Sequence, residues 1–92
     1  MIHDIKIHPQ YFELHIARQK EFELRRDDRP YAFGDTLRQL EFDPETETFS
    51  GRVAVSRVTC ALRNIPGLQP GYVALGTFFL QLELLPSVDN GE

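Results

Sequence analysis

Positively charged side chains cluster in one segment of the chain, together with a carboxylate and an aromatic ring. The residues of this segment that could bind a ligand are Lys20, Glu23, Arg25, Arg26, Arg29 and Tyr31. Arginine pairs with phosphate or carboxylate through two parallel hydrogen bonds, and lysine adds a compact charge. Proteins that bind single-stranded nucleic acid combine such cations with rings that stack on bases. The segment is therefore a candidate site for RNA or a nucleotide. Glu23 would orient the lysine and arginine side chains or accept a hydrogen bond from a nucleobase amino group.

A plainer interpretation of the same segment stays open. Glu21, Glu23, Arg25 and Arg29 could pair with one another on the solvated face of a strand. Charge alternation of this kind is common on half-exposed strands and contributes little to stability.

The other residues that could bind a metal or take part in catalysis give weaker signals. His3, His8 and His15 have no cysteine or acid at the spacing of metal ligands, so we expect neither a metal nor a cofactor. The single cysteine, Cys60, lies in an apolar run and is expected to be a small buried hydrophobe.

An acidic stretch, in contrast, is expected to form a solvated hairpin tip. Residues 41–50 contain no base and four acids, which are Glu41, Asp43, Glu45 and Glu47. Glutamate alternating with threonine, without a loop glycine, does not fit an EF-hand. The stretch could instead contact a basic protein partner.

The composition limits the class of protein. Ninety-two residues suffice for one hydrophobic core, and the net charge of −4 argues against indiscriminate binding to nucleic acid. No apolar run reaches the length of a membrane helix, no signal-like stretch begins the chain, and one cysteine permits no internal disulfide. We therefore expect a cytoplasmic protein that does not contact a membrane.

Several short elements must position these side chains. Apolar periodicity predicts one helix over residues 9–18 and strands over 2–7, 20–26, 36–42, 52–62 and 72–85. In the strand over 20–26, Phe22 and Leu24 are expected to face the core, with Glu21, Glu23 and Arg25 on the other face. Breaks in alternation predict bulges near Gln39 and at residues 56–57.

These elements predict a single α+β domain, mainly β, over residues 1–85, with a flexible tail over 86–92. The expected architecture is a small β-barrel of about five or six strands, with the helix plugging one side.

Several separated motifs resemble those of the ASCH superfamily, and in particular a branch of small bacterial and phage proteins with a domain of unknown function. They run from about Met1 to Phe78 and comprise residues 17–25, 28–29, 33–35, 51–52, 57–59 and 71–76. The resemblance implies a PUA-like barrel whose cleft, between helix and barrel, binds RNA or nucleotides. It places Lys20, Glu23 and Arg25 in that cleft. Arg18 and Gln19 stand where the family pattern has a glycine and a second base.

The resemblance also raises an enzymatic alternative. Some relatives in the superfamily are amidohydrolases that act on an acylated cytidine through a lysine, a threonine and a glutamate. Lys20 matches the lysine and would be the catalytic residue here, but Glu23 stands at the threonine position and the insert with the catalytic acid is missing. We therefore expect a binding domain without enzymatic activity, with a protein-interaction module or phage accessory protein acting on a host factor as a third possibility.

Overall fold

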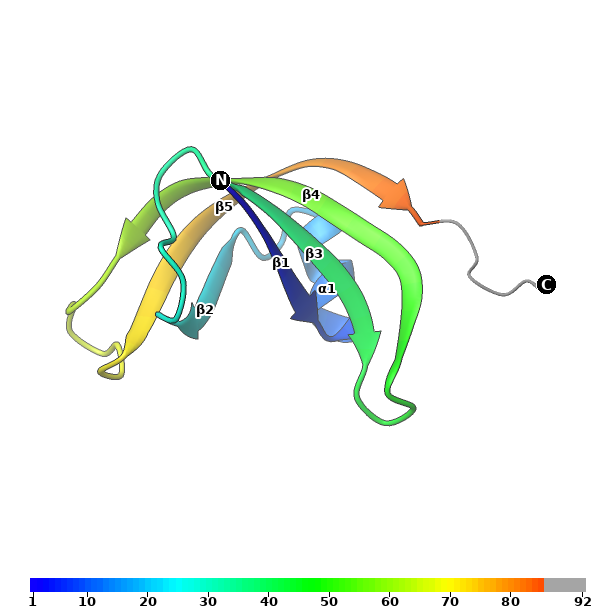
Figure 1. Cartoon of the computed structure of the whole chain (residues 1–92), viewed down its shortest axis with the longest axis horizontal. Coiled ribbons are helices and arrows are strands. Elements are labelled where there is room, and N and C mark those ends of the chain that lie inside the picture. Colours follow the sequence, from blue (N-terminus) through cyan, green and yellow to red (C-terminus); the bar gives the residue numbers. More distant parts are fainter. Residues whose placement is uncertain (86–92) are drawn as a thin grey trace.

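The computed structural model describes residues 1–85, which form one β-sheet and one helix (Figure 1). Along the chain the elements are β1 (Ile2–Ile7), α1 (Pro9–Ile16), β2 (Phe22–Arg26), β3 (Thr36–Asp43), β4 (Thr48–Leu62) and β5 (Tyr72–Leu84). The expected mainly-β fold with one early helix is confirmed. The tail expected over 86–92 lies outside the described residues.

The sheet has the strand order β1-β3-β4-β5-β2, in which β1 runs parallel to β3 and the other neighbours are antiparallel. It arches over α1, which lies under the concave side (Figure 1). β1 and β2 are its two edge strands, so the described strands form a curled half-barrel rather than the closed barrel that was predicted.

Irregular pairing in the long strands gives the sheet its curl. The register of β4 against β5 shifts between Val55 and Ser56 and again between Val58 and Cys60. Each shift adds a residue on one strand, which bends it and increases the local twist. The predicted bulge at residues 56–57 is thus found within one residue. The bulge expected near Gln39 lies between Leu40 and Phe42 instead, because Gln39 pairs regularly with Ala54.

The helix ends two residues earlier than predicted, and its last turn explains why. Arg18 adopts a left-handed conformation with φ 61°. The amide of Gln19 donates to the carbonyl oxygen of Leu14 at 2.8 Å, and that of Arg18 donates to the carbonyl oxygen of His15 at 3.0 Å. These two bonds form a Schellman motif, which usually has glycine at the left-handed position. Arg18 makes the turn despite its side chain, whose guanidinium lies 4.7 Å from the centre of the Phe78 ring.

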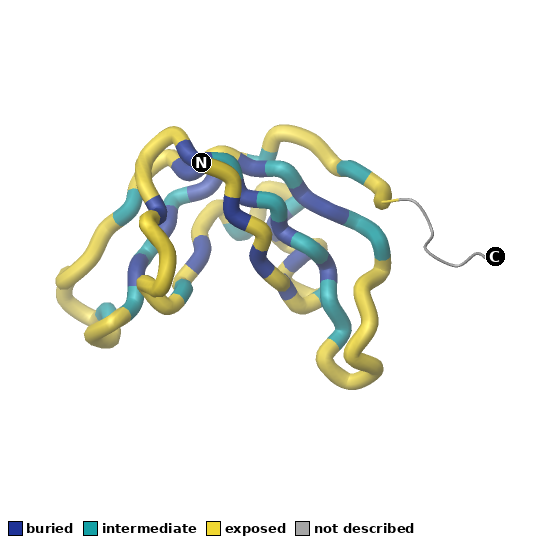
Figure 2. The backbone as a smooth tube through the Cα atoms, in the orientation of Figure 1, coloured by how far each residue is buried: buried dark blue, intermediate teal, exposed yellow. Residues whose placement is uncertain are grey.

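Two apolar clusters fill the concave side of the sheet, and Figure 2 shows buried positions along the arch with exposed hairpin tips. One cluster comprises Ile5, Tyr31, Leu37, Val58, Val73 and Leu75. The other comprises Ile7, Phe12 and Ala54, with Ile16 and Phe79 packed against it. Cys60 is exposed, so its expected burial is wrong; it follows the register shift after Val58, which changes the face that the strand presents.

Candidate functional site

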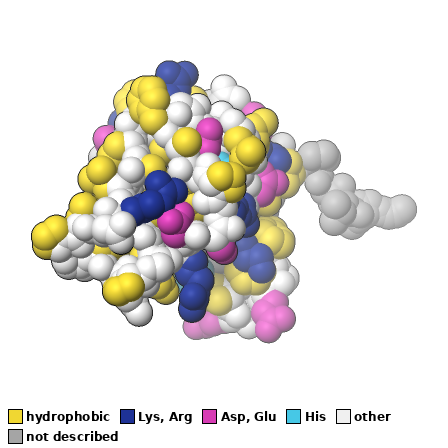
Figure 3. Space-filling model, turned by 60° about the vertical axis from the view of Figure 1, so that its left-hand side comes forward, with side chains coloured by type: hydrophobic (Ala, Val, Ile, Leu, Met, Phe, Trp, Pro, Cys, Tyr) yellow, Lys and Arg dark blue, Asp and Glu magenta, His cyan; other side chains and the backbone are white. Residues whose placement is uncertain are grey.

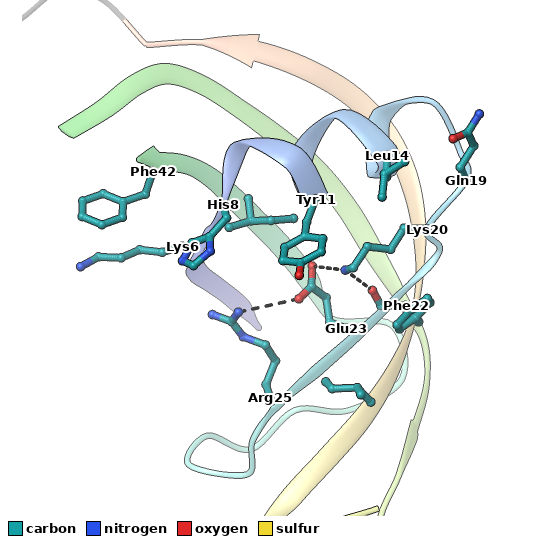
Figure 4. A pocket seen from close by; sticks show the side chains of 12 residues that line it. Lys6, His8, Tyr11, Leu14, Gln19, Lys20, Phe22, Glu23, Arg25 and Phe42 are labelled. Carbon is teal, nitrogen blue, oxygen red and sulfur yellow. Dashed lines mark hydrogen bonds and ion pairs between the residues drawn. The ribbon is translucent and has the colours of Figure 1, made fainter. Parts of the chain in front are cut away.

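A cleft of about 750 Å³ opens between α1 and β2, beside the end of β1 (Figure 4). Both edge strands of the half-barrel, β1 and β2, contribute residues to its lining. Its volume is within the range of roughly 300–1,000 Å³ that is typical of ligand sites. Its lining residues are Lys6, Ile7, His8, Tyr11, Leu14, Gln19, Lys20, Phe22, Glu23, Leu24, Arg25 and Phe42.

Strand β2 faces the opposite way from the prediction. Phe22 and Leu24, expected in the core, are 51% and 57% exposed, whereas Glu23 is only 4% exposed. The alternating pattern predicted correctly that every second residue of β2 faces inward, but it selected the wrong set of residues. The interior under β2 contains polar side chains that can hold a carboxylate, so Glu23 is buried there. The interpretation of Glu23 as a solvent-facing acid is therefore wrong.

The Glu23 carboxylate forms the floor of the cleft, and its two oxygens have different surroundings. Oε2 accepts hydrogen bonds from Lys20 Nζ and Gln39 Nε2, both at 3.2 Å. Oε1 faces the Arg25 guanidinium at 3.7 Å, which is beyond hydrogen-bond length. Figure 4 shows Glu23 between Lys20 and Arg25, with the Tyr11 ring beside it. Within the described part of the chain, Oε1 has unused capacity to accept a hydrogen bond.

Behind Glu23, a fully buried polar network crosses the half-barrel. Gln39 Oε1 accepts from Ser56 Oγ at 2.6 Å, and Ser56 Oγ lies 2.7 Å from His15 Nε2. His15 Nδ1 lies 2.9 Å from the Lys20 carbonyl oxygen, which closes the ring. The network thereby joins α1, β2, β3 and β4, and it fixes Glu23 from behind.

Hydrogen counting links the His15 imidazole to this network. The Lys20 carbonyl only accepts, and Ser56 gives its single hydroxyl hydrogen to Gln39, so both contacts are satisfied only when both ring nitrogens carry hydrogen. Burial opposes that charge and lowers the pKa of His15, although the bond to the Lys20 carbonyl acts to raise it.

The Lys20 ammonium is fixed in place. Besides Glu23, its Nζ donates to the Phe22 carbonyl oxygen at 2.6 Å and lies 4.9 Å from the centre of the Phe22 ring. The side chain is 14% exposed. The geometry thus favours Lys20 as a charged positioning group.

The other predicted site residues lie outside the cleft. Arg26 is exposed, with its guanidinium 5.8 Å from the centre of the Tyr72 ring. Arg29 donates from Nη1 to the Asp4 carbonyl oxygen at 2.6 Å. Tyr31 is 4% exposed and packs in the core, which leaves little of its ring accessible for the predicted stacking on a base. Both its neighbours in the chain and its aromatic character fitted a surface role, and only the tertiary fold reveals its burial.

Sequence reasoning missed the opposite wall of the cleft. Lys6, His8 and Phe42 line it from β1, its end and β3, with Lys6 Nζ 4.5 Å from the centre of the Phe42 ring. No motif marks these positions, because they come together only when β1 pairs with β3. Tyr11 lines the cleft from α1, and no pattern in the sequence marked it for a ligand site.

The acidic stretch divides between a hairpin tip and a buried ion pair. The tip between Asp43 and Thr48 is exposed as predicted. Glu41 is not part of it: this residue is 6% exposed, and Arg52 donates to its Oε1 at 2.8 Å. That bond lowers the pKa of Glu41. Arg52 also contacts Glu13 of the helix, which ties α1 to the sheet.

The three histidines lie on β1, at the N-cap of α1 and within α1. His3 is buried and its Nε2 lies 2.8 Å from Asp35 Oδ2, a bond that lowers the pKa of Asp35. Among residues 1–85, no group of three histidine, cysteine or acidic side chains is placed to hold a metal ion. The single helix of the described chain is too short and too polar to cross a membrane.

Comparison with known proteins places the chain in a family. Residues 2–77 match the family described as Domain of unknown function (DUF3850). An uncharacterised 12.9 kDa protein in the GpA 3′ region of Escherichia phage P2 is 40% identical over 58 residues, which are 63% of this chain and 51% of the phage protein. The matched part therefore spans about half the length of that curated relative. The chain belongs to the DUF3850 family, in agreement with the expected group of small bacterial and phage proteins of unknown function.

Proposed function

We propose that this DUF3850 domain binds a nucleotide unit, free or within RNA, with the base inside the cleft and the phosphate at its mouth. The resemblance to the ASCH superfamily supports the proposal, because it implies a PUA-like fold with a nucleotide or RNA cleft at the corresponding place. The observation that carries the proposal is the Glu23 carboxylate on the cleft floor.

Glu23 Oε1 suits a ligand that donates an N–H group. Oε1 has no hydrogen bond within residues 1–85 and faces the cleft, so a ligand N–H placed there would gain a charge-assisted hydrogen bond. The exocyclic amino group of cytosine or adenine is such a donor, whereas uracil presents a carbonyl oxygen there. The fixed position of Oε2 between Lys20 and Gln39 leaves Oε1 to read the base.

The walls of the cleft suit the rest of a nucleotide. Tyr11 and Phe22 are exposed aromatic rings on facing elements, and each can stack on a planar base. Lys6 and Arg25 bring positive charge to the same hollow, where it would neutralise a phosphate. Figure 3 shows that basic side chains are interspersed with acidic and hydrophobic ones over the face that it presents, so charge alone does not define the site.

The two alternatives from the sequence gain less from the geometry. An amidohydrolase would need a free nucleophile or an activated water, and Lys20 is held by two acceptors. A protein-interaction role for the acidic stretch loses Glu41 to its pair with Arg52. Both remain predictions, testable by incubation with acylated cytidines and by pull-down from a nuclease-treated lysate.

Calorimetric titration with CMP, AMP and UMP tests the proposal. We expect CMP or AMP to bind about ten times or more as tightly as UMP, because one hydrogen bond to a charged acceptor is worth about 1.5–3 kcal/mol. Glu23→Gln keeps the shape, but Lys20 and Gln39 hold the amide oxygen at the Oε2 position and the amide nitrogen faces the cleft, so the preference for CMP or AMP should be lost or shift toward UMP. Arg57→Ala, which removes an exposed arginine elsewhere on β4, is the matched control. Absence of binding by every nucleotide, or an unchanged preference in Glu23→Gln, would contradict the proposal.

A further inference from the structure

Two smaller hollows continue the cleft across the free edge of β2. Each has a volume of about 330 Å³. Arg25 lines both of them as well as the main cleft, and Arg29 lines both smaller ones. The three hollows therefore adjoin one another at Arg25, and the two smaller ones also share Arg29; together they are called the groove.

Within residues 1–85, the charge of Arg29 is held in place without an ion pair to a carboxylate. Its Nη1 donates to a backbone carbonyl oxygen, that of Asp4 on β1, at 2.6 Å. The Asp4 carboxylate is engaged elsewhere, because Arg38 Nη1 donates to both of its oxygens, at 3.1 and 3.3 Å. A guanidinium has five N–H donors, so most of those on Arg29 remain for a ligand. Arg29 thus presents a positioned cation in the gap between the two edge strands.

The hollow at the C-terminal end of β2 offers a second surface for a planar group. Its lining includes Tyr72 and Arg26, whose guanidinium lies 5.8 Å from the Tyr72 ring centre, and the exposed Leu24. Ring and guanidinium faces are the surfaces on which unpaired bases stack. Besides the hollow of the main cleft, the groove therefore contains a pair of arginines and a second stacking surface.

We infer that the ligand of the groove is a single-stranded polynucleotide of at least two nucleotides, not a free mononucleotide. One base occupies the main cleft, the connecting phosphate contacts Arg25 and Arg29, and the next base lies toward Tyr72 and Arg26. This inference rests on the proposed function, because it extends the same site. The alternation of planar group, anion and planar group is the repeat of a nucleic-acid strand, and an acidic peptide lacks it.

Titration with cytidine ligands of increasing length tests the inference. CMP and oligocytidylates of two, three and six nucleotides, in ribose and deoxyribose forms, are compared by calorimetry over a series of salt concentrations. We expect the trinucleotide to bind at least ten times as tightly as CMP. Its affinity should fall with salt, by about 0.7 in the logarithmic slope for each phosphate contacted. The ribose and deoxyribose arms show which strand the groove prefers.

Arg29→Ala separates the groove from the cleft. This variant should lower trinucleotide affinity about tenfold and leave CMP affinity unchanged, Arg29→Lys should keep part of the affinity, and Arg57→Ala should change neither. Circular dichroism verifies that each variant is folded. Equal affinity for CMP and the trinucleotide, or equal behaviour of Arg29→Ala and Arg57→Ala, would overturn the inference while the proposed function stands. Absence of binding by CMP and by all oligomers would overturn both.

Discussion

Removal of the Ser56 hydroxyl should lower the stability of the protein more than the loss of a single oxygen atom suggests. Ser56→Ala deletes one oxygen at a fully buried position where two partners converge, His15 Nε2 at 2.7 Å and Gln39 Oε1 at 2.6 Å. Both partners are themselves fully buried, so water cannot readily replace the lost bonds.

The expected loss follows from the two orphaned groups. A buried polar group left without a partner costs about 1–3 kcal/mol, and the network is cooperative, so we expect Ser56→Ala to lower the free energy of unfolding by about 2–4 kcal/mol. Domains of this size have total stabilities of roughly 5–14 kcal/mol. A shift of about 4–8 °C per kcal/mol then predicts a Tm lower by roughly 8–32 °C.

Urea denaturation followed by far-UV circular dichroism measures this loss, since the chain contains no tryptophan. Thr59→Ala is the matched control, because Thr59 is exposed on the same strand and its removal should change stability by less than about 0.5 kcal/mol. If Ser56→Ala and Thr59→Ala lose equal stability, the buried network does not hold the half-barrel together as described.

Three further outcomes follow from other parts of the structure. Bonding to His3 lowers the pKa of Asp35, so the stability that it contributes is complete above the unfolded value of about 3.9 and is lost as pH falls through the lower folded value; Asp35→Asn should flatten the acid limb of a stability profile measured by urea denaturation between pH 2 and 6. At position 18, where φ is 61°, Arg18→Gly should be more stable than Arg18→Ala by about 1 kcal/mol, because both variants lose the contact with Phe78 and only alanine keeps the strain; equal Tm values would contradict this. The exposed thiol of Cys60 should react with a thiol reagent in the folded protein at a rate that does not depend on unfolding, and protection until urea unfolds the chain would show the thiol to be buried.

The sequence predicted the elements well because their signals are local. Pro9 and the apolar spacing after it mark the start of α1, and β-branched runs between turns mark the strands. The end of the helix was missed because a left-handed Arg18 is not what the residue type indicates.

Which face of β2 is buried, and how deeply Glu23 and Tyr31 lie, could not be predicted from the sequence because both depend on tertiary structure. Alternation in residues 20–26 is equally compatible with either face inward, and the usual preference for apolar burial selected the wrong one. The polar side chains of Gln39, Ser56 and His15 explain why Glu23 faces inward instead. They come from β3, β4 and α1, and no motif in the sequence links them. Tyr31 was misplaced for the same reason, because its burial against Ile5 and Val73 involves distant strands.

A nuclear magnetic resonance titration with CMP tests the existence of the nucleotide site most directly. In a series of amide spectra, we expect the shifts that CMP changes to concentrate around the cleft, at Tyr11, Lys20, Glu23 and Arg25, with little change at Arg57 or at the hairpin tip near Glu45. Shift changes that are absent at millimolar CMP, or that concentrate away from α1 and β2, would contradict the proposal that this cleft binds a nucleotide.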